Sequence, residues 1–210
     1  MAADRALQPR KQGKQPRSAD TRQRILDGAA HVFEVHGYSA GTTNRIAAEA
    51  GVSIGSLYQY FPNKDSILHE LVKSHVDDAY STIGSYFASG ALPSALDEQV
   101  RIFVRAALDN HVGRPDLHRV LFEEAPHSRE LLEMLHDAEE SMVVAAADLL
   151  AVNGEVRVGD TKIAARLVVG AIESLVHKYV AANCPVDVHV FEDELVAMVC
   201  RYLRGAPMTL

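Results

Sequence analysis

Hydroxyl, amide and small side chains gather on residues 53–60, where no carboxylate interrupts them. If this stretch is helical, Leu57 and Phe61 are four residues apart and point together into a core. The opposite face then carries small residues, which let a helix approach DNA base edges, and hydroxyls, which donate hydrogen bonds to phosphate oxygens. We therefore predict that this face enters the major groove of DNA. It consists of Ser53, Ile54, Gly55, Ser56, Tyr58, Gln59 and Tyr60.

The residues before this face predict a helix-turn-helix. A first helix should begin at Thr42 or Thr43, whose hydroxyl can accept hydrogen bonds from the free backbone N–H groups at the helix start. It should end at Gly51, because glycine readily takes the left-handed conformation that a tight turn between crossing helices requires. Ala47 is expected where the two helices lie closest together, and Ser53 is expected to cap the second helix.

Two further helices should flank this motif. A helix that starts at Ser18, Asp20 or Thr21 and reaches about His36 would complete a three-helix head, with Gly37 ending it. Its apolar stripe is Ile25, Leu26, Ala29 and Phe33.

On the other side of the motif, Pro62 should close the second helix and Asn63 should cap the next one. A phosphate at the start of that helix would be favoured by its free N–H groups and by Lys64. The helix should continue through Ile67 and Leu68 into the C-terminal part of the chain.

Residues 25–68 resemble the DNA-binding domain of the TetR (tetracycline repressor-like) family of transcriptional regulators. Four motifs of that family occur in order and with its spacing: G-Y-x-x-x-T-T, I-A-x-x-A-G-V-S, G-S-L-Y-Q-Y-F and P-N-K-D. The resemblance implies phosphate contacts from Thr42, Thr43, Tyr58, Tyr60 and Lys64. It implies groove contacts from Asn44, Ile54, Gly55, Ser56 and Gln59, with Ser53 at the start of the same face. Many relatives carry a polar or basic residue in place of Ile54, so its base contact should be apolar, for example to a thymine methyl group.

The net charge of −7 is unevenly distributed along the chain. Residues 1–65 carry nine Lys/Arg and six Asp/Glu, whereas residues 66–210 carry twelve and twenty-two. A mildly basic N-terminal part can approach phosphates, while an acidic remainder limits indiscriminate binding. Residues 1–18 are basic and lack apolar periodicity, so we predict a disordered arm, either a solvated tail or a segment that lies along DNA.

The remaining sequence predicts helices throughout, which makes the fold all-α. We expect a helix-turn-helix domain at residues 19–65 and a helical ligand-binding and dimerisation domain at 66–210. Breaks at Gly, Pro and Asn residues divide the second domain into helices near residues 94–112, 115–124, 127–152, 160–183 and 189–204.

The last two predicted helices carry broad apolar stripes, and small residues such as Ala164 and Gly170 allow close packing. Such stripes fit an intramolecular core or a two-fold interface. We favour a homodimer, because a two-fold protein can bind two half-sites of a palindrome. The resemblance implies that the corresponding helices form this interface and that the domain encloses a small-molecule site, whose residues the sequence does not reveal.

Catalytic and metal-binding patterns give no consistent site. Gly51 to Gly55 fits the G-x-S-x-G nucleophile elbow, but that elbow follows a strand and the preceding residues are helical. The ten histidines form no HExxH motif and no close cluster in sequence. We therefore expect a non-enzymatic protein with no catalytic residues, no metal ligands and no cofactor.

Composition agrees with a cytoplasmic protein of 210 residues. Cys184 and Cys200 form no disulfide framework, and the sequence suggests neither a signal peptide nor a membrane span. Together these patterns predict a DNA-binding transcriptional regulator, in particular a repressor that binds a palindromic operator as a dimer and is released by a small, largely apolar ligand. The alternatives are a small-molecule-binding protein or enzyme with a vestigial DNA-binding head, and a regulator that activates rather than represses, which the sequence does not distinguish from a repressor.

Overall fold

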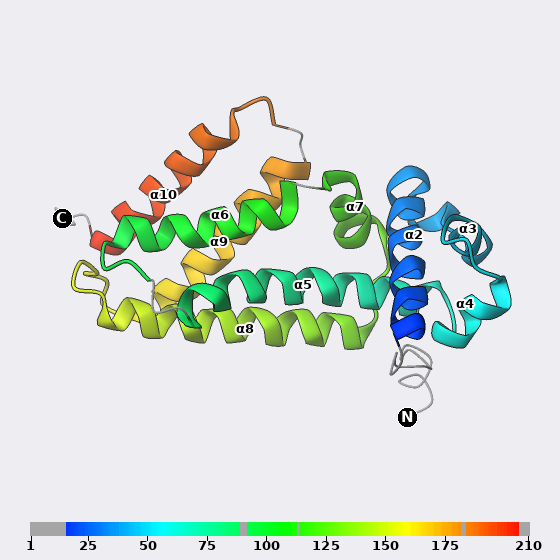
Figure 1. Ribbon diagram of the computed structural model, residues 1–210. Coiled ribbons are helices and arrows are strands. Elements are labelled where there is room, and N and C mark those ends of the chain that lie inside the picture. The colour runs from blue at the N-terminus through cyan, green and yellow to red at the C-terminus, as the bar shows by residue number, and fades with distance from the viewer. Residues whose placement is uncertain (1–15, 89–91, 113, 182–183, 206–210) are drawn as a thin grey trace. The chain divides into compact units, whose positions relative to one another are not determined.

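The computed structural model describes residues 16–88, 92–112, 114–181 and 184–205, and within these ranges the regular structure is entirely helical (Figure 1). The prediction of an all-α fold is confirmed. The helices are α2 (Pro16–Ala40), α3 (Thr43–Glu49), α4 (Ile54–Tyr60), α5 (Lys64–Ala88), α6 (Leu96–Val112), α7 (Pro115–Arg119), the π-helical turn η1 (Val120–Glu124), α8 (Arg129–Val152), α9 (Thr161–Ala181) and α10 (Val188–Arg204).

The first helix begins earlier than the sequence suggests. Helix α2 starts at Pro16, so residues 16–18 are helical, while the rest of the predicted arm, residues 1–15, lies outside the described residues. Gly37 interrupts α2 with a φ of 72°. The predicted break after His36 is therefore present, and a short helical turn follows it before α3.

The chain forms two compact units, each built from two segments. Among the described residues, one unit contains residues 16–75 and 114–132, and the other contains those of residues 76–112 and 133–205 that the structure describes. Both units therefore draw on the predicted C-terminal domain. Arg114 at the start of α7 donates to the Glu34 carboxylate of α2 at 2.8 Å, and Leu117, Val120 and Leu121 are buried in the same unit.

In the first of these units, a small apolar core holds α2, α3 and α4 together. Five large side chains of this core have no exposed surface: Ile25 and Phe33 of α2, Ile46 of α3, Leu57 of α4, and Phe61, the residue that follows α4. Burial of each such side chain contributes about 1.5–3 kcal/mol to folding. The helices also approach closely, since a Cβ atom on Gly28 would lie 2.9 Å from the backbone nitrogen of Ala50.

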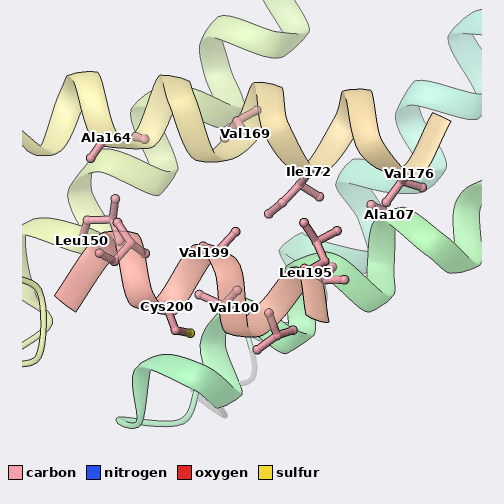
Figure 2. Packing of buried hydrophobic residues seen from close by; sticks show 14 of the residues in the cluster. Val100, Ala107, Leu150, Ala164, Val169, Ile172, Val176, Leu195, Val199 and Cys200 are labelled. Carbon is pink, nitrogen blue, oxygen red and sulfur yellow. The ribbon is translucent and has the colours of Figure 1, made fainter. Parts of the chain in front are cut away.

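The second unit is organised around α9 and α10, which share one core with α6 and α8. Figure 2 shows Leu195 and Val199 of α10 close to Ile172 of α9, with Val100 of α6 in the same cluster. Ala164 and Ala165 are fully buried, as expected of small residues at a close helix contact.

Ion pairs connect α10 to α6 and to the loop before α9. Glu192 is 4% exposed, and it accepts hydrogen bonds from Arg101 at 3.0 Å and Arg105 at 2.8 Å. Near the other end of α10, Arg204 donates to Glu155 at 2.6 Å, and Glu155 also accepts the Leu96 backbone N–H at 2.9 Å. In the described part of the chain, no helix combines the length and apolar character that crossing a membrane requires.

Candidate nucleic-acid interface

The turn between α3 and α4 has the predicted geometry. Thr42 caps α3, and its hydroxyl oxygen accepts the Arg45 backbone N–H at 3.3 Å. Gly51 takes a φ of 62°, so the left-handed turn is confirmed. The Val52 N–H donates to the Ala47 carbonyl at 3.0 Å and closes the corner. Ala47 itself is buried, as expected for a small residue between two helices.

Arg24 of α2 stabilises this turn through contacts that were not predicted from the sequence. Its guanidinium donates to the carbonyl of Ala50 at 2.6 Å and to that of Gly51 at 3.0 Å. These carbonyls lie at the end of α3, where a helix leaves its last acceptors without intrahelical partners. Because 26 residues separate Arg24 from Ala50, sequence spacing gave no signal for this contact.

Helix α4 presents all of the predicted face except Tyr60 to solvent, with Ser56 half-buried. Ser53 caps it by accepting the Ser56 N–H at 3.0 Å, and Leu57 and Phe61 point into the core with no exposed surface. The exposed residues of this face are Ser53, Ile54, Gly55, Tyr58 and Gln59, and Ser56 is half-buried. A Cβ atom on Gly55 would meet nothing nearer than the Ser53 hydroxyl at 3.9 Å, so the backbone is open to a partner here.

Tyr60 differs from the expectation. Its side chain is 5% exposed, so the expectation that it lies on the exposed outer face is wrong. The cause is the helical period: Tyr60 lies three residues after Leu57 and thus falls on the same side of α4. The exposed tyrosine of this face is Tyr58, which is 43% exposed.

The start of α3 contributes a second set of polar groups beside α4. The Thr43 hydroxyl lies 3.1 Å from the Tyr58 hydroxyl, while Thr42, Asn44 and Arg45 are exposed. In this pair one hydroxyl donates to the other, and the accepting hydroxyl keeps its own proton, which it can donate to a phosphate oxygen.

Lys64 is fixed at the start of α5 by contacts with Tyr38. Its ammonium group donates to the Tyr38 carbonyl at 2.9 Å and lies 4.0 Å from the centre of the Tyr38 ring. The Tyr38 hydroxyl in turn donates to Asp65. Burial, and then the hydrogen bond and negative charge of Asp65, raise the pKa of Tyr38, so the ring stays neutral. Asn63 caps α5 by accepting the Ser66 N–H at 2.8 Å, as predicted.

Ser53 has no setting for nucleophilic catalysis. It lies between α3 and α4, in a tight turn whose geometry is that of a helix cap, whereas a nucleophile elbow requires a preceding strand. Helices α3 and α4 and the start of α5 instead carry side-chain hydroxyls, amides and one ammonium group. These groups suit recognition of a phosphate-rich surface.

Comparison with known proteins agrees with this interpretation. Residues 25–71 match the family model described as bacterial regulatory proteins, tetR family, and residues 95–203 match the tetracyclin repressor-like C-terminal domain. Among curated relatives, the HTH-type transcriptional repressor KstR2 of Rhodococcus jostii is 38% identical over 69 residues. That match covers 33% of this chain and 34% of the relative, so this chain spans about a third of that protein's length.

Solved structures extend the similarity of fold over most of the chain. The fatty acid degradation regulator FadR from Bacillus halodurans has a TM-score of 0.72 and 22% identity, covering 93% of this chain and all of its own. The FadR of Bacillus subtilis, solved in complex with stearoyl-CoA, has a TM-score of 0.69 and 21% identity, covering 85% of this chain and 97% of its own. At these identities the similarity establishes the fold.

Proposed function

Because this chain belongs to the tetR family of bacterial regulatory proteins, we propose that it is a sequence-specific DNA-binding transcriptional repressor rather than an enzyme. Its Rhodococcus relative KstR2 is named a transcriptional repressor, which supports repression as the direction of regulation. A DNA-binding regulator acts where the chromosome lies, and the proposal therefore includes a cytoplasmic location.

The observation that carries the proposal is the exposed, acid-free face of α4 beside the hydroxyls at the start of α3. In the proposed complex, α4 enters the major groove, and exposed Ile54 makes an apolar contact such as one to a thymine methyl group. Phosphate contacts come from Thr42, Thr43, Tyr58 and Lys64, and groove contacts come from Asn44, Ser53, Ile54, Gly55, Ser56 and Gln59. Tyr60 is left out because it is buried.

Exposed apolar side chains on α9 and α10 support a homodimer. Ile163 and Leu167 of α9 are 59% and 55% exposed and lie one turn apart. On α10, exposed Met198 and Tyr202 lie one turn apart and form a second short stripe, and Val190 is exposed near the start of the same helix. A second copy of the chain that covers both stripes would remove this apolar surface from water. The resulting two-fold symmetry matches an inverted-repeat operator.

The effector in this proposal is a small, largely apolar molecule bound by the C-terminal domain. The Bacillus subtilis FadR structure, which holds stearoyl-CoA, supports an apolar component of the ligand for a protein of the same fold, because the stearoyl chain is apolar whereas the coenzyme A part is polar and charged. Release from DNA requires that the ligand bind the DNA-incompetent state more tightly, because a ligand with equal affinity for both states shifts no equilibrium.

The proposal is tested by selecting double-stranded DNA from a randomised pool with the purified full-length protein at two salt concentrations. A specific regulator should recover one inverted repeat at both, since base contacts add to the salt-dependent phosphate contribution. Recovery of no common sequence would contradict the proposal and would favour a protein that acts through its C-terminal domain alone.

A further inference from the structure

Two histidines that are far apart in the sequence lie together within the second unit. His111 is in the last turn of α6, and His177 is on α9. Their Nε2 atoms are 3.0 Å apart, and their ring centres are 4.5 Å apart. Because 66 residues separate the two histidines, no sequence motif predicts that they lie together.

A backbone carbonyl fixes the orientation and tautomer of His111. Its Nδ1 lies 2.5 Å from the Ala107 carbonyl oxygen, one turn earlier on α6. A carbonyl only accepts hydrogen bonds, so Nδ1 carries the proton and Nε2 of the neutral ring carries the lone pair. His111 is 3% exposed, and burial lowers its pKa, which keeps the ring neutral. A metal-binding histidine typically has this arrangement, with its second nitrogen donating to a carbonyl or carboxylate.

Glu173 brings a carboxylate to the same place. It lies one turn before His177 on α9, and its Oε2 atom is 3.5 Å from His177 Nε2. One donor atom from each of His111, Glu173 and His177 lies within 4.8 Å of the other two. The side chains of His177 and Glu173 are 33% and 38% exposed, so solvent and ions can reach these two members of the cluster.

We propose that His111, Glu173 and His177 form a binding site for a divalent transition-metal ion, for which Zn²⁺ is the best match. Two imidazole nitrogens and one carboxylate oxygen are a ligand set that Zn²⁺ accepts, and the fourth position stays open for water or another ligand. Zinc–nitrogen bonds of about 2.0–2.1 Å place tetrahedral donors about 3.3 Å apart. The observed separations of 3.0 Å and 3.5 Å lie on either side of that value.

The competing arrangement is a metal-free hydrogen-bond chain. In it, His177 Nε2 carries a proton and donates to the lone pair of His111, and Glu173 adds only its charge. Both arrangements fit the same distances, but they differ in whether the site takes up an ion. Glu173 and His177 are half-exposed, so either can be replaced with little loss of packing.

The test uses the full-length protein without a histidine tag, stripped of metal with a chelator and then desalted. Zn²⁺ is titrated against a fluorescent competing chelator in the absence of DNA, and Co²⁺ is added in parallel because its visible absorption reports coordination geometry. We expect one ion per chain. His177→Ala and Glu173→Gln should each weaken binding by more than the ~10–100-fold that loss of an outer partner of a metal ligand causes.

His136→Ala is the matched control, because His136 is exposed on α8 and outside the cluster. It should bind Zn²⁺ as the unmodified protein does, and circular dichroism should show that all three variants are folded. Absence of saturable one-to-one binding would overturn the site, as would equal affinity in the His177→Ala and unmodified proteins. Since no DNA is present, either result is independent of the operator selection described above.

Discussion

The hydroxyl oxygens of Thr43 and Tyr58 lie 3.1 Å apart and join the start of α3 to the exposed side of α4. Each comes from a different helix of the motif, so their contact fixes how the two helices present polar groups together. It also makes the two residues a unit, whose contributions to DNA binding should not be additive.

Tyr58→Phe should weaken operator binding about tenfold, because a hydrogen bond to a charged group contributes ~1.5–3 kcal/mol when buried and less when exposed. The loss should be similar for all operator sequences, since a phosphate contact carries no base information. Fluorescence anisotropy measures both effects. Ser141→Ala, which removes a hydroxyl at an exposed position on α8, is the control and should bind DNA normally. Unchanged affinity of the Tyr58→Phe protein would remove Tyr58 from the interface.

Gly51→Ala and Gly55→Ala should have opposite consequences. Gly51 has a φ of 62°, and a Cβ atom there would lie 2.8 Å from Arg24 Nη2, so alanine should destabilise the fold by about 1–2 kcal/mol. Gly55 has open space around it, and alanine is favoured in a helix, so stability should be kept or slightly raised. DNA affinity of the Gly55→Ala protein should nevertheless fall, because the added methyl group lies on the face that approaches the bases. Thermal unfolding and anisotropy separate the two effects, and a destabilised Gly55→Ala protein would contradict the account.

Leu167→Asp should convert the proposed dimer into a monomer. The substitution puts a charge within the exposed apolar stripe of α9, where burial of an unpaired carboxylate is costly. Light scattering during size-exclusion chromatography gives the mass directly. Val152→Asp, at an 81% exposed position at the end of α8, should leave the mass unchanged. If the Leu167→Asp protein stays dimeric, the interface lies elsewhere.

Stability should decrease at acidic pH through Glu155. The Leu96 backbone N–H, followed by Arg204, holds the pKa of the Glu155 carboxyl below its usual value. A carboxyl whose pKa is lower in the folded state adds stability above its unfolded pKa, and this is lost as pH falls through the folded pKa. The melting temperature of Glu155→Gln should thus lie below that of the unmodified protein at pH 7 and approach it below about pH 4. Asp148→Asn, at an exposed position on α8, should show no such convergence.

Residues close together in the sequence were enough to predict most of the helix-turn-helix and the start of α5. Caps at Thr42, Ser53 and Asn63 and the left-handed turn at Gly51 each depend on residues within one helical turn, and all four are present. Tyr60 was wrongly predicted to be exposed because the prediction relied on its hydroxyl group. Its position three residues after buried Leu57 places it on the buried side of α4. Periodicity alone would have identified it as buried.

Contacts across long sequence separations could not be read from the chain in the same way. Arg24 reaches the carbonyls at the end of α3, and His111 meets His177, only after helices distant in sequence have packed. Nothing in the spacing of arginines or histidines indicates such meetings. No metal ligands were expected because the histidines form no motif of closely spaced residues in the sequence. The donors of the proposed site instead come from two helices that are distant in sequence.

The central claim is tested most directly by anisotropy titration of three DNA duplexes with the full-length protein. They are the selected inverted repeat, the same duplex with one half-site scrambled, and a fully scrambled duplex, each at low and physiological salt. A dimeric sequence-specific regulator should bind the inverted repeat at least ~10³-fold more tightly than the fully scrambled duplex at physiological salt. Its affinity for the duplex with one scrambled half-site should lie between these two values. Equal affinity for all three, lost together as salt rises, would mean that only phosphates are bound and would contradict the account.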